Sequence, residues 1–187
     1  MKIEELVSRY RTVADGASSA AVPATVLAHI ADDVLEMVRS YAGDSRVFFD
    51  KGDLVNAFAA SAYGFGWLDC GCYLGLTQGA HCGMPELEKE FPSVLWEKLE
   101  EKTLRYQRML TEALAAVSVA PDAETIAATA AKEIFAYAAE YLNRGAALLP
   151  EDYVNALSAF SYGYGWLDCG VRFGLFAISG NRHLFTI

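Results

Sequence analysis

The segment DLVNAFAASAYGFGWLDCGCYLGL at residues 53–76 occurs again in the chain as DYVNALSAFSYGYGWLDCGVRFGL at residues 152–175. Fifteen of the twenty-four positions are identical. A weaker similarity joins IEELVSRY at residues 3–10 to LEEKTLRY at residues 99–106, so the repeat extends over whole modules. Because repeats of a fixed period mark repeated structural units, we interpret the chain as a tandem duplication.

Helical periodicity dominates both copies. Apolar residues recur at helical spacing, and no stretch shows the sustained alternation that is typical of a strand. Proline stands near predicted helix starts and glycine near predicted ends, which suits the first turn and the C-terminal cap of a helix. The predicted helices span about residues 3–14, 24–43, 50–79, 93–117, 123–145 and 150–180.

The predicted fold is all-α, with two tandem three-helix up-and-down bundle modules. The modules are residues 1–80 and 93–187, and a charged connector with Gly and Pro at residues 81–92 joins them. A module of this size buries a small share of its surface when it stands alone, so we expect the two to share an interface. We expect a pseudo-twofold pair that packs through the third helices.

The composition and charge exclude some classes of protein. Of the 187 residues, 53% are hydrophobic, as in a globular protein. A net charge of -9 and a pI near 4.8 argue against nucleic acid as a partner, because phosphate binding needs clustered Lys and Arg. The segment MKIEELVSRY at residues 1–10 has no apolar signal core, so we expect a cytoplasmic protein.

The sequence predicts no metal, no cofactor and no catalytic residue. Cys70 and Cys169 are repeat equivalents inside apolar segments, and we expect both to be buried, reduced thiols. Cys70 and Cys72 are two residues apart, which on a helix directs them to separate faces. Paired metal-ligand motifs, a Gly-rich phosphate loop and a nucleophile beside a base are missing from the sequence.

A stripe of small residues is repeated without substitution on the predicted third helices. Each interior glycine destabilises a helix by roughly 0.5–1 kcal/mol relative to alanine, so another interaction has to offset several of them. We expect close helix packing, with the stripes at or near the contact between the modules. The alternative is that they leave space for a flat ligand. The glycines of the stripe are Gly64, Gly71, Gly75, Gly163, Gly170 and Gly174.

Beside this stripe lies an edge of amide and aromatic residues, which is the candidate binding site. A Tyr and a Trp four residues apart could stack on a planar group, and the amide could bind it by hydrogen bonds. The other interpretation is that the aromatic residues belong to the core and that neighbouring backbone satisfies their polar atoms. The candidates are Asn56, Tyr63, Trp67, Asn155, Tyr162 and Trp166.

The repeated acids are interpreted as structural. Asp168 precedes Arg172 by four residues, the spacing of a helical ion pair, and Asp69 precedes Tyr73 by the same interval. Acids at the start of each third helix, Asp53 and its equivalent in the second copy, are expected to act as N-terminal caps. An Asp inside each third helix also argues against a membrane span, despite the apolar sequence around it.

The string YGxGWLDCG, preceded by VNA and followed by a further glycine, resembles the signature of the archaeal family called domain of unknown function 357. The matching positions in the first copy include Asn56, Tyr63, Trp67 and Asp69, and the second copy repeats them. The resemblance implies a small up-and-down helical bundle in a cytosolic archaeal protein without an established activity. Since the motif occurs twice here, one chain can hold a pairing that single-copy relatives would make as homodimers.

These observations together favour a non-catalytic, cytosolic helical interaction or scaffold protein. A protein partner or self-association is expected, and neither a nucleic acid nor a membrane is. The alternative is a protein that binds a small molecule, or an enzyme, with its site in a groove between the two modules. That groove would be lined by the Asn/Tyr/Trp edge described above.

Overall fold

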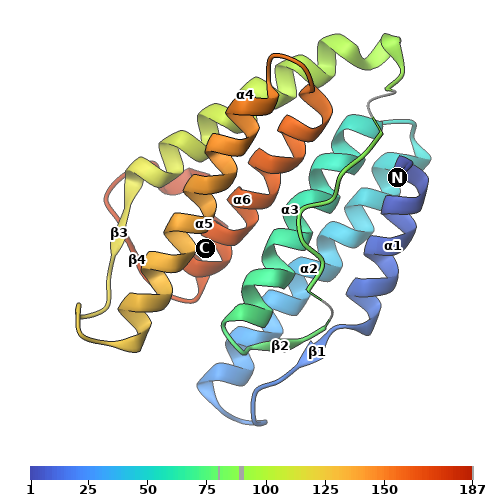
Figure 1. The fold of residues 1–187 in the computed structure, drawn as a ribbon. Helices are drawn as coiled ribbons and strands as arrows, with labels where there is room; N and C mark the ends of the chain where they lie inside the picture. The colour runs from blue at the N-terminus through green and yellow to red at the C-terminus, as the bar shows by residue number, and fades with distance from the viewer. Residues whose placement is uncertain (80, 89–90, 187) are drawn as a thin grey trace.

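The computed structural model describes residues 1–79, 81–88 and 91–186, and its helices form two groups of three (Figure 1). The first group comprises α1 (Ile3–Gly16), α2 (Val26–Asp50) and α3 (Leu54–Tyr73). The second comprises α4 (Trp96–Ala116), α5 (Ile126–Leu148) and α6 (Tyr153–Arg172). Two short 3-10 helices are η1 (Ser93–Leu95) and η2 (Arg182–Leu184). The predicted all-α fold with two three-helix modules is confirmed.

The third helix of each module begins with the expected acidic cap. The Asp53 carboxylate accepts a hydrogen bond from the backbone N–H of Asn56 at 3.3 Å. Asp152 accepts the equivalent bond from Asn155 at 3.0 Å. Each bond satisfies a backbone donor that the first turn of a helix leaves without a partner.

Both third helices end earlier than predicted, because two glycines of the small-residue stripe are caps. Gly75 and Gly174 adopt left-handed conformations, with φ of 69° and 87°. After Gly75, the N–H of Leu76 donates to the carbonyl of Gly71 at 2.9 Å, which is the Schellman arrangement. The prediction that Gly75 and Gly174 are helix-packing residues is therefore wrong, and nothing lies within 4 Å of a Cβ built on either.

The helices α2 and α5 continue past the glycines that were predicted to end them. Gly43 lies inside α2, with nothing within 4 Å of the position that a Cβ would take. Gly145 lies inside α5, where a Cβ would stand 2.3 Å from the ring of Phe160. A glycine weakens a helix by about 1 kcal/mol, which does not end a helix that packs along its length.

Two short antiparallel ribbons, which the sequence did not predict, join the first and third helices of each module. One pairs β1 (Ser18–Ser19) with β2 (Thr77–Gln78), and the other pairs β3 (Val117–Val119) with β4 (Phe176–Ile178). Strands this short carry no readable alternation. They form because the chain leaves two helix ends side by side, where exposed backbone groups can pair.

The helices α3 and α6 run side by side in the same direction at the centre of the molecule (Figure 1). Every residue at 57–71 of α3 and at 156–171 of α6 is buried. One hydrophobic core extends through both modules. Within the described residues, none of the helices combines the length and the apolar character that crossing a bilayer requires.

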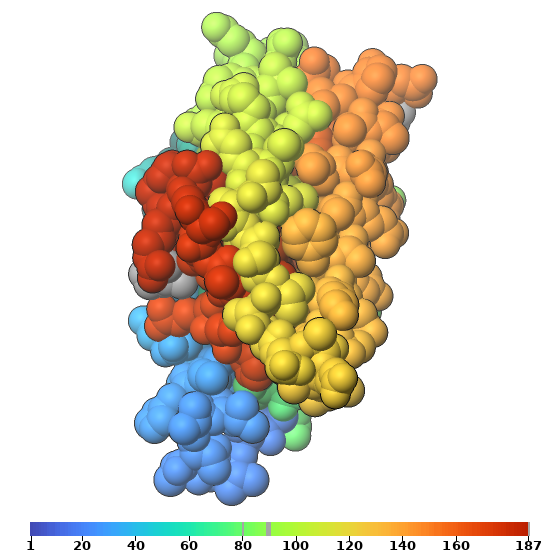
Figure 2. All heavy atoms as spheres, turned by 90° about the vertical axis from the view of Figure 1, so that its left-hand side faces the viewer, coloured from blue at the N-terminus to red at the C-terminus, as the bar shows by residue number. Residues whose placement is uncertain are grey.

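Two segments outside the helices cover the seams between the modules. The connector at residues 81–88 runs along α3, and within it Leu87 bonds to Asn155 of α6 (Figure 1). The C-terminal segment, red in Figure 2, lies between α4 and the first module. The two segments occupy equivalent places in the two modules, as expected for a pseudo-twofold pair.

Candidate functional site

The four aromatic residues of the predicted binding edge are packed in the core between the modules. Tyr63 and Trp67 of α3 are 5% and 0% exposed, and Tyr162 and Trp166 of α6 are 1% and 2% exposed. The ring of Tyr137 stacks on Trp166, with centroids 4.8 Å apart and planes 10° apart. These side chains therefore fill the space in which an open groove was considered.

Ring contacts and burial hold the indoles of Trp67 and Trp166 in place. The Nε1 atoms of Trp67 and Trp166 are buried and have no hydrogen-bond partner among the described residues. On the second indole, Tyr73 adds a further ring contact at 5.7 Å between centroids. The two indoles are thus core residues, in agreement with the second interpretation of the edge.

The two tyrosines reach across the module contact to the two repeated acids. The hydroxyl of Tyr162 donates to Asp69 Oδ2 at 2.6 Å. The hydroxyl of Tyr63 donates to Asp168 Oδ2 in the same way. Both carboxylates are fully buried. The repeated Tyr and Asp therefore form two reciprocal bonds between the modules.

The helical partners that the sequence suggested for these acids are wrong. Arg172 donates instead to Asp33 of α2, at 2.7 Å, and the hydroxyl of Tyr73 donates to Glu133 of α5. Both of these contacts also join one module to the other. Spacing along a single helix could not reveal them, because their partners are distant in sequence.

Each buried acid also holds the segment that covers its seam. Asp69 accepts hydrogen bonds from the backbone N–H groups of Cys82 and Gly83, both at 2.8 Å. Asp168 accepts from Thr186, at 3.1 Å from the backbone N–H and at 2.6 Å from the hydroxyl. Each acid therefore connects three parts of the chain and not one helical turn.

Burial controls the protonation of this cluster. It raises the pKa of Asp168, against the opposing effect of the hydrogen bonds from Thr186 and Tyr63. Burial and the adjacent Asp168 raise the pKa of Tyr63 well above its ordinary value. Burial and Asp69 raise the pKa of Tyr162 as well. Both phenols stay protonated at neutral pH, so they act as hydrogen-bond donors and not as bases.

The two asparagines of the predicted edge lie away from the indoles and bind other segments. Asn56 Oδ1 accepts a hydrogen bond from the Lys102 ammonium of α4 at 2.6 Å. Asn155 exchanges two hydrogen bonds with the backbone of Leu87, at 3.0 and 3.1 Å. Each amide also donates to the carboxylate of its own N-cap. The aromatic residues of the edge therefore pack in the core, and its asparagines bind other segments of the chain.

The backbones of α3 and α6 approach each other at Gly66 and Gly165, which are not among the six glycines predicted to lie at or near the contact. A Cβ on Gly66 would lie 2.3 Å from the carbonyl oxygen of Tyr162, and a Cβ on Gly165 would lie 2.2 Å from that of Tyr63. These glycines let the backbones of α3 and α6 meet. Neither belongs to the small-residue stripe.

The stripe glycines inside the helices pack within their own module. A Cβ on Gly64 would overlap the hydroxyl of Tyr10, and one on Gly71 would lie 2.9 Å from Val34. In the second module, a Cβ on Gly163 would lie 2.7 Å from Tyr141, and one on Gly170 would lie 3.0 Å from Ile134. The predicted position of the stripe at the module contact is wrong, since it faces the first and second helices.

Cys70 and Cys169 are buried next to each other at the module contact. Burial raises the pKa of Cys70 well above its ordinary value, and the neighbouring Cys169 thiol contributes in the same direction. Thiols of this kind are unreactive. Among the residues that the structure describes, no three His, Cys, Asp or Glu side chains are grouped as a metal ion would require.

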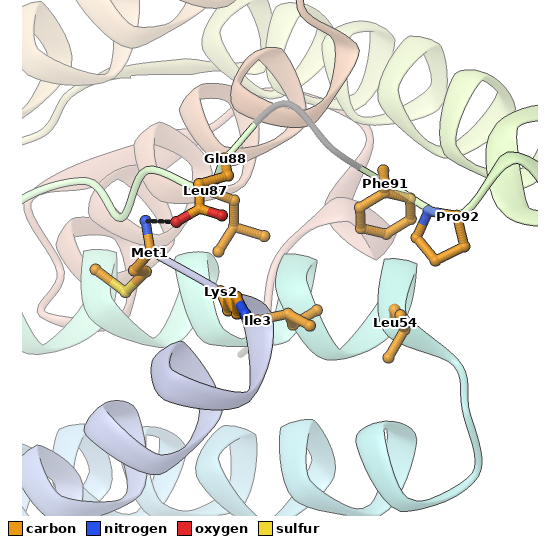
Figure 3. Close-up of a pocket in the computed structure, with 8 residues that line it drawn as sticks. All are labelled: Met1, Lys2, Ile3, Leu54, Leu87, Glu88, Phe91 and Pro92. Atoms are coloured by element: carbon orange, nitrogen blue, oxygen red, sulfur yellow. Dashed lines mark ion pairs between the residues drawn. The ribbon is translucent and has the colours of Figure 1, made fainter.

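Two surface hollows lie away from the buried YGxGWLDCG strings, near the ends of the third helices. One, of about 240 Å³, is formed by the start of α1, the start of α3 and the connector (Figure 3). Its lining is mainly apolar and includes Ile3, Leu54, Leu87 and Phe91. A second, of about 330 Å³, lies at the other end of the molecule, between Tyr73 of the first module and Ile126 of the second.

A family model described as a protein of unknown function, DUF357, matches the chain in two segments, residues 7–77 and 105–176. Together the two segments cover more than half of the chain, and each includes the second and third helices of one module and the C-terminal part of the first. No curated protein and no solved structure matches the chain at a significant level. The two matches agree with the duplication that the repeated segments indicate.

Proposed function

This chain belongs to the DUF357 family, and we propose that it acts as a non-catalytic helical interaction module in the cytoplasm. The observation that carries the proposal is that the repeated polar residues form hydrogen bonds between the two modules. Tyr63 and Tyr162 donate to Asp168 and Asp69 across the module contact. Polar groups that hold two modules together in a buried core are not free to act on a substrate.

The surface supports the same proposal. Exposed apolar side chains include Val26 at 74%, Ile126 at 87% and Val94 at 86%. Exposed apolar side chains that are close in sequence, such as Val22, Val26 and Leu27 around the start of α2, offer contact surface to another protein. The buried thiols Cys70 and Cys169 suit a reducing compartment, which supports the cytoplasmic location.

A turnover screen tests whether the protein is catalytic. Purified protein is incubated with a cell-derived metabolite mixture, and mass spectrometry follows substrates lost and products formed. We expect the mixture to remain unchanged. Turnover that disappears in both Asp69→Asn and Asp168→Asn would overturn the proposal, provided that circular dichroism shows both variants folded.

Native mass spectrometry tests the interaction role directly. A tagged chain is isolated under mild conditions from the cells that produce it, and the masses of its complexes are measured. We expect complexes of defined stoichiometry with another protein. Isolation of the chain as a monomer alone, at its cellular concentration and low ionic strength, would contradict the proposal.

A further inference from the structure

The second hollow, named here the Tyr73 groove, is lined by residues that include Tyr73, Leu74, Ile126, Ala130 and Phe173. It lies where the C-terminal ends of α3 and α6 meet the start of α5. Its volume is about 330 Å³, and Ile126 at its edge is 87% exposed. We propose that the Tyr73 groove binds a basic amphipathic helix of a partner protein, and this rests on the proposed interaction function.

The shape of the surface fits a helix. Ile126, Ala130, Glu133 and Tyr137 stand three or four residues apart, so they share one face of α5. Tyr137 is 43% exposed and Tyr73 is 40% exposed. These residues form a stripe of three apolar or aromatic side chains and one acid, and such a stripe beside a hollow can receive one face of a partner helix.

The charged residues around the groove favour a positively charged partner. Glu133 lies on the stripe and is exposed, and its carboxylate accepts the hydrogen bond from Tyr73. Asp122 and Glu124, just before α5, are exposed acids at the same end of the molecule. Lys132 is the basic residue in this part of α5, and the whole chain carries a net charge of -9. Lys or Arg beside the apolar residues of a partner would complement these acids.

The same charges disfavour a second copy of the chain as the occupant. A symmetric pair would place Glu133, Asp122 and Glu124 of one copy near those of the other. Like charges that face each other across an interface oppose association. The partner is therefore a different chain with basic residues.

The pseudo-twofold relation supplies a matched control within the molecule. Val26 begins α2 as Ile126 begins α5, each directly after a threonine cap, and Val26 is 74% exposed. On that side Arg172 takes the place of Tyr73, because it follows the same motif in the second copy. On the Val26 side the acid Asp33 is therefore paired with the Arg172 cation, whereas at the Tyr73 groove the acid Glu133 is paired with a neutral phenol.

The test is a methyl NMR titration of the full chain with two synthetic helical peptides of equal length. One carries Leu on one face and Lys on the other, and the second has the same Leu pattern with Glu in place of Lys. We expect the Lys peptide to shift the methyl signals of Ile126 and Leu74 and to bind less tightly as salt is raised. We expect the Glu peptide to leave these signals unchanged.

Two single-residue variants test where the Lys peptide binds. We expect Ile126→Ser to weaken binding of the Lys peptide by roughly tenfold, as for loss of one apolar contact, and Val26→Ser to leave the Kd unchanged. Equal binding of both peptides, equal effects of both variants, or no binding would each overturn the inference. Self-association lost in Ile126→Ser would also overturn it, in favour of a second copy.

This titration and the turnover screen can fail separately. If the Lys peptide does not bind while metabolites remain unchanged, the inference about the groove fails and the interaction role stands. If turnover depends on Asp69 and Asp168, the proposed function fails whatever the peptides do.

Discussion

Asp69 and Asp168 each connect a helix of their own module, a covering segment and a tyrosine of the other module. Burying a carboxylate is unfavourable unless hydrogen bonds replace its water. Asp69 receives them from Tyr162, Cys82 and Gly83, all at 2.8 Å or less. The repeated Asp and Tyr residues thus stabilise the junction between the two modules.

The first prediction concerns the tyrosine hydroxyls. Tyr63→Phe removes a donor from the buried Asp168, so we expect a loss of about 1–3 kcal/mol in the free energy of unfolding. The measurement is urea unfolding at neutral pH. Tyr73→Phe is the control, since its hydroxyl bonds to an exposed acid, and it should change stability by no more than about 0.5 kcal/mol. Equal effects of the two variants would contradict the structural role of the Tyr63 bond.

The second prediction concerns pH. Burial raises the pKa of folded Asp168 above 3.8, so the folded state holds this proton more tightly than the unfolded state does. The resulting contribution to stability is full below the unfolded pKa and is lost as pH rises through the folded pKa. The stability of the wild type minus that of Asp168→Asn should therefore fall as pH rises from acid to neutral, as measured by unfolding at several pH values.

Asp53 provides a control, because its pKa is shifted in the opposite direction to that of Asp168. Burial raises the pKa of its carboxyl, but hydrogen bonds from Lys98 and Asn56 outweigh burial and lower it overall. Its contribution is present above the unfolded pKa and is lost as pH falls through the folded pKa. The difference between the wild type and Asp53→Asn should grow as pH rises. The same trend in both variants would refute this assignment of the two acids.

Among the helices, the contact between α3 and α6 depends on two glycines. Gly66 and Gly165 bring the helix backbones so close that the nearest Cα of the partner helix would lie 3.1 Å from an added Cβ. Such proximity lets the tyrosines of one helix reach the acids of the other. The remaining interior glycines, such as Gly71, make the equivalent space inside each module.

The third prediction therefore compares glycines. Gly66→Ala would place a Cβ against backbone that cannot move aside, so we expect a loss of about 1–3 kcal/mol or more in the free energy of unfolding. Gly43→Ala is the control, because it adds a methyl group in open space within α2 and should stabilise by roughly 0.5–1 kcal/mol. Thermal and urea unfolding measure both, and a neutral Gly66→Ala would mean that the helices lie farther apart.

The fourth prediction concerns packing inside a module. Gly71→Leu would drive a side chain into Val34 and Thr77, and we expect a loss of about 1–3 kcal/mol from overpacking. Urea unfolding measures the loss. If the melting temperature stayed the same, this face of α3 would have to border solvent or a cavity.

On the scale of the whole molecule, bonds between the modules follow α3 and α6 from one end to the other. Lys98 donates to Asp53 at one end, and Arg172 donates to Asp33 at the other. The tyrosine–acid pairs lie between them. Together with the shared core, these contacts make the two modules one structural unit.

The fifth prediction follows from this unit. We expect one cooperative unfolding transition, because neither module has a core of its own apart from the shared one. Circular dichroism reports helix content, and fluorescence reports the surroundings of the three tryptophans, of which Trp67 and Trp166 are buried. The two unfolding curves should coincide in urea. Separate midpoints would show that the modules unfold independently.

The sequence by itself determined the duplication, the helical class, the three-helix modules and the acidic caps, because these follow from identity, periodicity and local hydrogen bonding. The tertiary structure alone decided that Tyr63 meets Asp168, that Gly66 marks the module contact and that Gly75 ends a helix. The physical reason is the range of the interactions. Spacing on one helix favours a partner four residues away, whereas a buried carboxylate takes whichever donors the fold brings to it, and here one of them belongs to the other module.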